Sequence, residues 1–441
     1  MANATICNRI KDAGVVGAGG AGFPTHVKLN CNAELVIGNG AECEPLLRVD
    51  QQLMEKEAHS VLLGLSLAMK AVGAKEGVLA TKSHYKGAVS ALKAVLREFP
   101  NIRLHLMKSY YPAGDEKSLI YEVSRRVVPT GKLPVDVGVV VCNVNSLLNI
   151  ARADEGIPVT HKFVTVAGEV KHPATFEVPI GTDAYELLSR AKIAGRESEL
   201  ILLVGGPCMG RLTEDWHLPI TKTVGGLILL PKSHPYVQKR TLSLSRQVSL
   251  AKAVCCQCSQ CTQLCPRNAL GLHVQPHKAM RAVAQANGRL VGDPNSILAC
   301  CSCGLCSNYA CNFSLDPAGI MAELKVELAK QGIKPQPEEN IRPDSSLELK
   351  KVPVARLIAR MGLKKYDMPA PIETPPRVTR VTIPLRQHIG APSEPIVTEG
   401  AVVMAGDLIA MIPEGALGAN VHASISGRVV RVSPDSIELE A

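Results

Sequence analysis

Two short cysteine clusters constrain this chain more than any other feature. Ten of its fifteen cysteines lie between residues 255 and 311. In the first cluster the cysteines are separated by two, two and three residues, and Pro266 follows; in the second the gaps are two, two and four residues. A C-x2-C-x2-C turn directs three thiolates at one cubane iron–sulfur cluster, and in two-cluster ferredoxins the fourth ligand comes from the other motif.

This rule assigns four thiolates to each of two [4Fe–4S] clusters. The first cluster is expected to be held by Cys255, Cys258, Cys261 and Cys311. The second is expected to be held by Cys300, Cys303, Cys306 and Cys265. The adjacent Cys256 and Cys301 are out of register, so we interpret them as packing residues. The chain is therefore predicted to transfer electrons one at a time.

Zinc and a disulfide scaffold are the alternatives for so many cysteines. Zinc normally takes two C-x2-C pairs or recruits histidine, and it gives no reason for three evenly spaced cysteines followed by Pro266. Disulfide scaffolds suit small secreted domains, whereas this chain has 441 residues and shows no signal-peptide pattern in its first ten. Both alternatives are disfavoured.

Composition limits the cell compartment and the kinds of partner that we expect for this chain. No apolar run approaches about 18 residues, so no membrane span is expected. The net charge of +9 is spread along the chain and aromatic residues make up only 3%, which argues against a nucleic-acid surface. Oxygen-sensitive clusters and reduced thiols indicate the cytoplasm.

The first 150 residues alternate between strand and helix patterns. Apolar strand-like runs occur at 35–37, 78–80, 102–107 and 137–141, and helical patterns at 51–72, at 86–99 and from about residues 114 and 145. This alternation predicts an α/β domain with a mostly parallel sheet. Ligands of such sheets bind beyond the carboxyl ends of the strands, where polar residues and glycines occupy residues 38–45, 81–85, 111–116 and 142–145.

A glycine-rich loop precedes the first expected strand. Gly17, Gly19 and Gly22 match G-x-G-x-x-G, but no strand comes before them and Pro24 interrupts the helix that should follow. We therefore reject the usual dinucleotide fingerprint. A loop without side chains still lets backbone N–H groups approach a phosphate or a flat ring, and Lys28 would add a positive charge.

At this point the sequence resembles a known family. The glycine loop and Lys28 are similar to the flavin-binding loop of the NADH-oxidising 51-kDa subunit of respiratory complex I. Residues 39–45, 111–117 and 205–210, together with both cysteine motifs, resemble more closely the RnfC protein of the Rnf electron-transport complex (an RnfC-like family) through about residue 325.

The resemblance implies non-covalent FMN, with NADH stacking on it. It places Gly17, Gly19, Gly20 and Lys28 at the FMN phosphate region. It places Asn39, Glu42, Glu44, Asn143 and Ser146 along the flavin, and Asp115 and Glu116 near the nicotinamide nucleotide. Ala41 and Cys142 depart from the complex I pattern, in which an acidic residue and an asparagine occupy these positions.

The remaining segments predict a chain of separate modules. We expect an FMN- and NADH-binding α/β domain (1–155), a β-grasp domain resembling soluble-ligand-binding (SLBB-like) domains (156–235), a helical 2[4Fe–4S] ferredoxin-like domain (243–329), a proline-rich linker (331–376) and a barrel-sandwich, lipoyl-like module (377–441). No lysine follows Lys365, so the last module is not expected to carry a covalent cofactor.

The order of the modules refines the resemblance. RnfC proteins have their barrel-sandwich module first, whereas here it comes last. That order is most similar to the corrinoid reductases of propanediol-utilisation microcompartments. The resemblance implies a reductase that passes electrons from NADH through FMN and two clusters to cobalamin, readying it for adenosylation, with an adenosyltransferase and the shell as partners. An electron-input subunit that serves a protein acceptor, or a scaffold with a decayed flavin site, would be the alternatives.

Overall fold

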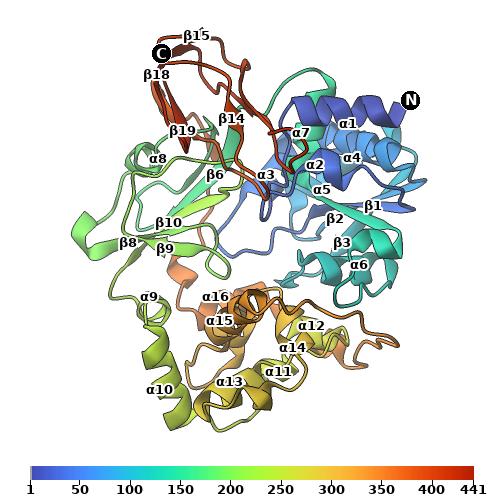
Figure 1. Cartoon of the computed structure of the whole chain (residues 1–441), viewed down its shortest axis with the longest axis vertical. Coiled ribbons are helices and arrows are strands. Elements are labelled where there is room, and N and C mark those ends of the chain that lie inside the picture. The colour runs from blue at the N-terminus through green and yellow to red at the C-terminus, as the bar shows by residue number, and fades with distance from the viewer. Residues whose placement is uncertain (1) are drawn as a thin grey trace.

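The computed structural model describes residues 2–441, with side chains from Thr5 onward. An α/β domain and a mixed β-sheet lie side by side in the upper half of the molecule, the C-terminal module lies above them, and a helical domain forms the lower half (Figure 1). None of the described helices is long and apolar enough to cross a membrane.

The α/β domain contains a four-stranded parallel sheet. Its order is β3 (Ile102–Met107), β2 (Glu76–Lys82), β1 (Leu35–Gly40) and β5 (Val139–Asn143). This confirms the predicted parallel sheet, although β5 begins two residues later than expected because a 3₁₀ turn, Pro134–Val137, ends at Gly138 with a φ of 73°. The strand order reverses between β1 and β5, which marks the expected position of a ligand crevice.

Helices cover both faces of this sheet. Val36, Leu79 and Val140 share a core with α4 (Ala58–Val72) and α7 (Val144–Asp154). Leu35, Ile37 and Val78 alternate with them and face α6 (Glu116–Ser124) on the other side. The contact between α4 and α7 is so close that a Cβ on Gly64 would lie 1.9 Å from the carbonyl oxygen of Leu147.

The prediction of a single helix over residues 51–72 is wrong, because the structure has two helices there. Two helices, α3 (Val49–Lys56) and α4, are separated at Glu57, whose φ of −121° leaves the helical region. The break lets α3 pack on α5 (Lys86–Val95) while α4 packs on α7. Tertiary packing has thus divided a continuous helical pattern.

A second domain contains a six-stranded mixed sheet. Its order is β12 (Ile372–Glu373), β7 (Ala174–Pro179), β6 (His161–Gly168), β10 (Gly226–Pro231), β8 (Leu200–Val204) and β9 (Arg211–Thr213). The helix α8 (Ala184–Arg190) begins after Asp183, which caps it by accepting from the Tyr185 amide, and it ends at Ala191.

The helical domain holds both cysteine motifs. It contains α9 (Pro235–Arg240), α10 (Leu244–Val254), α11 (Gln260–Gln263), α12 (Pro266–Ala269), α13 (Pro276–Ala284), α14 (Asn295–Leu298) and α15 (Pro317–Lys330). Its core includes Leu270, Leu272 and Ile297 as well as Cys265. The cysteine loops are therefore anchored in packed structure.

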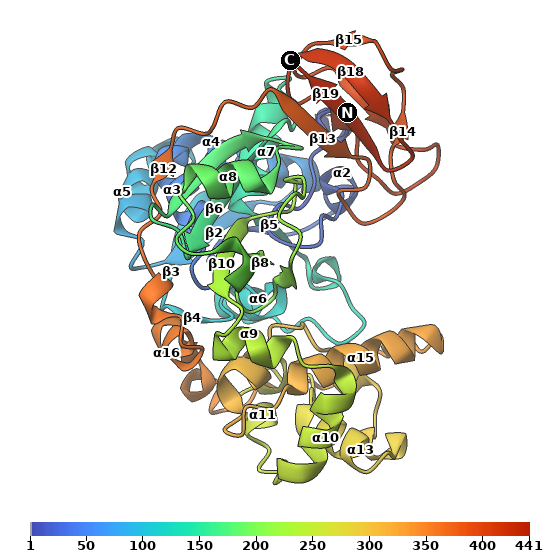
Figure 2. The same ribbon diagram turned by 90° about the vertical axis from the view of Figure 1, so that its left-hand side faces the viewer.

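The segment expected as a linker, residues 331–376, packs on two domains. Its strand β11 (Val352–Pro353) pairs with β4 (Tyr110–Tyr111) of the α/β domain, and β12 extends the mixed sheet beside β7. Between them α16 (Val354–Arg360) buries Leu357 and Ile358. In Figure 2 this connector runs along the left side of the molecule, past β3 and β4. The prolines end its elements without keeping it extended.

The C-terminal module is formed by two antiparallel sheets. One contains β13 (Arg380–Pro384), β19 (Ser436–Glu440), β18 (Gly427–Val432) and β15 (Val402–Val403). The other contains β14 (Glu394–Pro395), β16 (Leu408–Met411) and β17 (Val421–His422). The buried Lys222 joins three domains, since its Nζ donates to the carbonyl oxygens of Gly14 and Asn420, each at 2.7 Å.

Candidate flavin and iron–sulfur sites

The glycine loop lies against the start of α7, at the switch point between β1 and β5. The Ala18 amide donates to the Ser146 hydroxyl at 2.9 Å. A Cβ on Gly19 would lie 2.8 Å from Nδ2 of Asn143, whereas a Cβ on Gly20 would meet nothing within 4 Å. One side of the loop is thus closed against α7 and its cap, and the other side is open, as a flat ligand requires.

Polar groups around this loop fit a bound flavin. The Gly17 amide donates to the Phe23 carbonyl oxygen, which closes the loop at 2.9 Å. The side-chain nitrogen Nδ2 of Asn145, at the start of α7, is buried and has no hydrogen-bond partner among the described residues. The sequence placed Asn145 in a strand-end segment but did not single it out; a second asparagine two residues after Asn143 is the signal that could have identified it.

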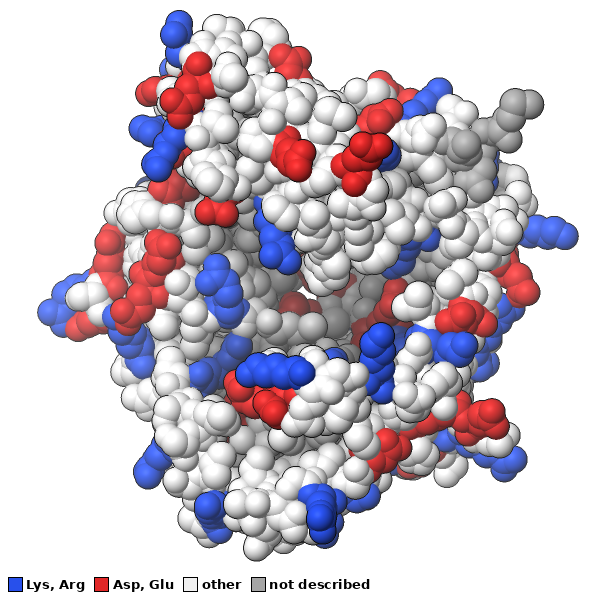
Figure 3. Space-filling view, viewed as in Figure 1, with Lys and Arg blue, Asp and Glu red and all other residues white. Residues whose placement is uncertain are grey.

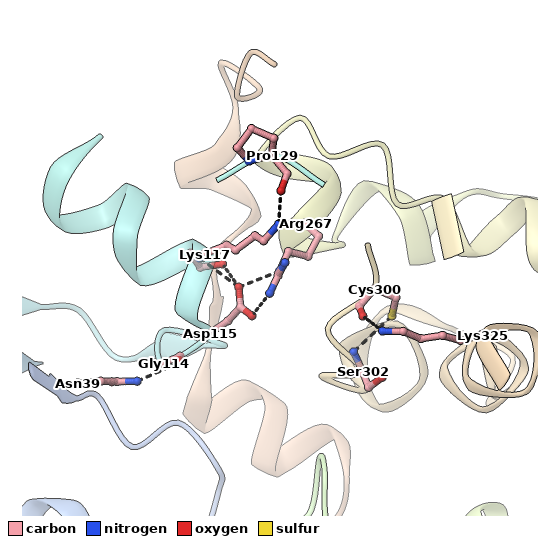
Figure 4. A network of polar contacts seen from close by, with 10 residues as sticks. Asn39, Gly114, Asp115, Lys117, Pro129, Arg267, Cys300, Ser302 and Lys325 are labelled. Atoms are coloured by element: carbon pink, nitrogen blue, oxygen red, sulfur yellow. Dashed lines mark hydrogen bonds and ion pairs between the residues drawn. The ribbon is translucent and has the colours of Figure 1, made fainter. Parts of the chain in front are cut away.

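Lys28 and Glu116 form an ion pair. Their Nζ and Oε1 atoms are 3.1 Å apart. Burial lowers the pKa of Lys28, but the Glu116 carboxylate more than offsets this, so the pKa is raised overall. Nearby, Asn39 donates through Nδ2 to the Gly114 carbonyl oxygen at 3.0 Å (Figure 4). The structure therefore brings Lys28, the last residue of α2 (Thr25–Lys28), to the start of α6, and Asn39 of β1 holds the turn that precedes this helix.

A buried acid, Asp50, lies beside Asn143, and the partly buried Glu42 lies next to it. Asp50 accepts from Asn143 Nδ2 at 2.9 Å, and its own amide donates to Glu42 at 3.1 Å. Burial and the Asp50 carboxylate raise the pKa of Glu42, and burial raises that of Asp50 to about 6. Lys162, which donates to the Ala18 carbonyl oxygen, has its pKa lowered by burial to about 8. Sequence reasoning missed Asp50 and Lys162, because both lie in apolar patterns far from the glycine loop.

Glu44 connects three parts of the molecule. Its Oε2 accepts from the Cys208 amide at 2.8 Å, in the loop of residues 205–210. Its Oε1 lies 3.4 Å from the Tyr111 hydroxyl, which donates to the Cys303 carbonyl oxygen at 2.6 Å. Burial raises the pKa of Glu44 to about 7, although the Cys208 amide and Tyr111 oppose that shift.

The raised pKa of Glu44 predicts a pH dependence of stability. The folded protein holds this proton more tightly than the unfolded chain, so the stability that it contributes is complete below about pH 4.5 and declines as the pH rises toward 7. We expect Glu44→Gln, whose oxygen still accepts from Cys208, to flatten this slope and to be more stable than the wild type at pH 8. Unfolding temperatures measured from pH 5 to 8 test this; parallel curves for both proteins would contradict it.

Asp115 joins the α/β domain to the helical domain. It caps α6 by accepting from the Ser118 amide, and Arg267 of α12 donates to both its oxygens, at 3.0 and 2.6 Å (Figure 4). The two side chains are only 8% and 11% exposed. Burial alone would raise the pKa of Asp115, but Arg267 and Ser118 lower it overall. Arg267 was not anticipated from the sequence.

The first predicted set of thiols surrounds one cavity. Cys255, Cys258, Cys261 and Cys311 all line it. Burial, followed by the thiols of Cys311, Cys255 and Cys258, raises the pKa of Cys261 to about 12. Thiolates are the iron ligands, so assembly of a cluster here should release protons.

The second predicted set is also gathered together. Burial, then the neighbouring thiols of Cys300 and Cys265, raises the pKa of Cys306. Cys265 precedes α12, where the backbone amides of Asn268 and Arg267 favour its thiolate although burial raises its pKa overall. The Ser302 amide points at Cys300 Sγ at 3.4 Å, and Lys325 donates to the Cys300 carbonyl oxygen (Figure 4).

The two cysteine loops share one backbone conformation. Gln257 and Ser259 in the first loop have φ values of 56° and 61°, and the matching Ser302 and Gly304 have 56° and 69°. The extra residue before Cys311 is accommodated by a π-helical turn, Cys306–Ala310, whose Cys311 amide donates to the Cys306 carbonyl oxygen at 3.1 Å. The longer gap in the second motif therefore still brings Cys311 to the first cavity.

Cys256 and Cys301 have different environments. Cys301 is partly buried beside Cys303, whereas Cys256 is exposed, so the interpretation of Cys256 as a packing residue is wrong. Among the residues that the structure describes, no three His, Cys, Asp or Glu side chains converge on a single-ion position. The first set of thiols instead surrounds a cavity, which suits a cluster of several iron atoms.

The surface is hollowed between these sites. Figure 3 shows a hollow at the centre of one face, between the sheet domains above and the helical domain below, with basic side chains at its rim. A flavin crevice and two four-cysteine sets on adjoining domains define a flavin- and iron–sulfur-dependent oxidoreductase.

Comparisons with known proteins agree with this class. The chain matches the Nuo51 FMN-binding domain at residues 10–152, a 4Fe-4S dicluster domain at 254–316 and the RnfC barrel sandwich hybrid domain at 358–440. It is 44% identical over 437 residues to the cobalamin reductase PduS of Salmonella typhimurium, covering 98% of this chain and 95% of that protein. The chain belongs to the cobalamin reductase PduS family.

More distant relatives share part of the chain. One component of the Na(+)-translocating ferredoxin:NAD(+) oxidoreductase complex of Acetobacterium woodii is 33% identical over 277 residues, which are 62% of this chain and 58% of that protein. A crystal structure of an NAD+-reducing [NiFe]-hydrogenase in the air-oxidised state aligns with a TM-score of 0.49 and 19% identity, covering 83% of this chain and 68% of that one.

Proposed function

We propose that this protein is an NADH-dependent cobalamin reductase that delivers electrons singly through FMN and two [4Fe–4S] clusters. Identity of 44% over nearly the full length of both chains supports the same acceptor as that of PduS. FMN, when bound, supplies the conversion from hydride to single-electron transfer. The protein's own residues bind the cofactors, orient them and exclude water.

The observation that carries this proposal is the direct contact between the two cofactor-binding parts. Tyr111, beside the predicted nicotinamide segment, donates to the backbone of the cluster ligand Cys303 at 2.6 Å. Asp115 and Arg267 fix the same junction through their paired hydrogen bonds. Electrons that leave the flavin crevice therefore need to cross only one domain boundary to reach the second cysteine set.

The roles of the crevice residues follow from their contacts. Gly17, Gly19 and Gly20 would present backbone to FMN, and Asn39, Glu42, Asn143 and Ser146 would fix its position. Lys28 would neutralise the phosphate, and Glu116, its present partner, would then turn to the nicotinamide nucleotide. Glu44 and Asp115 are engaged by Cys208 and Arg267, so they would act on FMN and NADH by shaping the crevice.

The proposal extends to the cellular setting. A cobalamin reductase supplies a reduced cobalt centre, so an adenosyltransferase would use its product. By its relation to PduS, we place the chain in the cytoplasm, within a propanediol-utilisation microcompartment whose shell is a further partner.

Anaerobic spectroscopy of the purified chain tests the function. NADH should bleach the flavin and cluster absorbance, and hydroxocobalamin added afterwards should be converted to cob(II)alamin. Bleaching without any change at cobalt would favour an electron-input protein that serves a protein acceptor, as in the ion-translocating relatives. An absence of releasable FMN would favour the scaffold.

Gly20 tests the flavin crevice. Because a Cβ there would meet nothing within 4 Å, Gly20→Ala should leave the unfolding temperature unchanged. If FMN covers the open side of the loop, the added methyl should weaken FMN binding roughly 10-fold, equivalent to about 1.4 kcal/mol. Fluorescence titration with FMN measures this. Gly288→Ala, also without neighbours within 4 Å, is the control, and equal FMN affinity for both variants would place the flavin elsewhere.

A further inference from the structure

A second cavity, of about 940 Å³, is lined on one side by the segment that follows β1. One wall is residues 42–48 with α3, another is the end of β2 and the residues that follow it, and the third is the connector, through α16 and residues 367–372. Its volume is near the upper end of the range of about 300–1,000 Å³ typical of small-molecule sites. The glycine loop is not part of its lining.

The cavity combines apolar walls with scattered polar groups. Leu47 and Ile358 contribute apolar surface, as do Met368, Pro369 and Pro371 of the connector. Gln51 and Ser109 lie among them and can hydrogen-bond to amides. Such a lining suits a large, flat and mostly uncharged ligand with a polar rim.

The charges disfavour a dinucleotide. Arg48 is paired with Asp367, and Lys82 donates to the Glu42 carbonyl oxygen, so two of the three Lys and Arg side chains of the wall are already engaged, and Lys56 is the third. The carboxylates of Glu44 and Glu55 also line the cavity. A pyrophosphate would meet these acids, and the glycine loop that could bind it is not part of the lining. Carboxylates do accept hydrogen bonds from carboxamides, which surround a corrin ring.

The cavity is adjacent to the cluster domain. Glu44, in its wall, is 3.4 Å from the Tyr111 hydroxyl, which is bonded to the Cys303 backbone. From the same wall, α16 reaches the first set, because Arg360 donates to the Cys311 carbonyl oxygen at 3.4 Å. A ligand here would lie next to structure that contacts both predicted clusters.

We propose that this cavity binds the corrinoid acceptor, separately from the nicotinamide nucleotide. The proposal rests on the function proposed above. One NADH is oxidised to NAD+ with release of a proton, and two cobalt(III) centres, visiting the cavity in turn, are each reduced by one electron to cobalt(II). Donor and acceptor thus occupy different faces of the segment after β1, and neither has to leave before the other binds.

Two tryptophan variants on one helix test the site. Ala355 is exposed on α16 and lines the cavity, whereas Ala359, also exposed on α16, does not. We expect Ala355→Trp to weaken hydroxocobalamin binding in equilibrium dialysis at least 10-fold and to lower NADH-driven cobalamin reduction accordingly. Ala359→Trp should match the wild type. The NADH–ferricyanide rate of both variants should stay unchanged, because that small acceptor does not need the cavity.

Each other outcome has a distinct meaning. Equal hydroxocobalamin binding by both variants overturns the cavity assignment. Weaker NADH binding by Ala355→Trp alone reassigns the cavity to the dinucleotide and also overturns it. A wild type that does not reduce cobalamin contradicts the proposed function, whatever the variants do. If Ala355→Trp loses its ferricyanide activity, Met368→Trp, at a 52% exposed cavity residue, replaces it.

Discussion

Replacing Cys258 with alanine is expected to remove the first iron–sulfur cluster and leave FMN in place. Cys258 lines the first cavity with the three other predicted ligands and with Cys256, and the glycine loop belongs to a different domain with a different core. Even changes to residues that only support the ligands of a metal site cost about 10–100-fold, so loss of a ligand should reduce cobalamin reduction at least ~100-fold. Iron content should fall by half, with FMN per chain unchanged.

The adjacent Cys256 provides a matched control for this experiment. Cys256 lines the same cavity and is exposed, as Cys258 is, but its position is out of register with the predicted ligands, so Cys256→Ala should keep the full iron content and activity. Equal iron loss in both variants would show that the ligand assignment is wrong. Loss of FMN along with iron in Cys258→Ala would show that the flavin and cluster domains depend on each other to fold.

Replacing Arg267 with methionine is expected to destabilise the junction between the flavin and cluster domains. The change leaves the Asp115 carboxylate buried without its guanidinium partner. Breaking a buried ion pair from one side costs about 3–5 kcal/mol. We expect a corresponding loss of free energy of unfolding in urea titrations, together with slower electron transfer from NADH to the clusters.

A double variant tests whether the loss of stability comes from the unpaired Asp115 charge or from another effect of replacing Arg267. Asp115→Asn removes the unpaired charge and still caps α6, so combining it with Arg267→Met should recover most of the lost stability. As a surface control, Arg103→Met at the half-exposed pair with Glu76 should cost less than about 1 kcal/mol. If the double variant is as unstable as Arg267→Met, the Asp115 charge is not the cause.

The sequence was sufficient where function depends on local spacing. The prediction of eight cluster cysteines rests on intervals of two to four residues, and a turn of that length has few ways to direct its thiols. At Gly19 the loop has no room for a side chain, because a Cβ there would lie 2.8 Å from Asn143 Nδ2, whereas Gly20 faces open space. The parallel sheet followed from alternating strand and helix patterns.

Other features depended on contacts between distant residues. Arg267 and Asp115 are 152 positions apart, and Glu44 and Cys208 are 164 apart, so no local pattern relates them. The same holds for the connector, whose prolines indicated a linker, although Leu357 and Ile358 are buried in the structure.

The sequence by itself determined the cofactors, because ligand spacing and glycine loops are properties of short segments. Only the tertiary structure decided how the flavin crevice, the clusters and the second cavity adjoin. The contacts between these sites depend on buried ion pairs such as that of Asp115 with Arg267, because a buried charge is stable only beside a partner. Tertiary packing, and not distance along the chain, decides which residue that partner is.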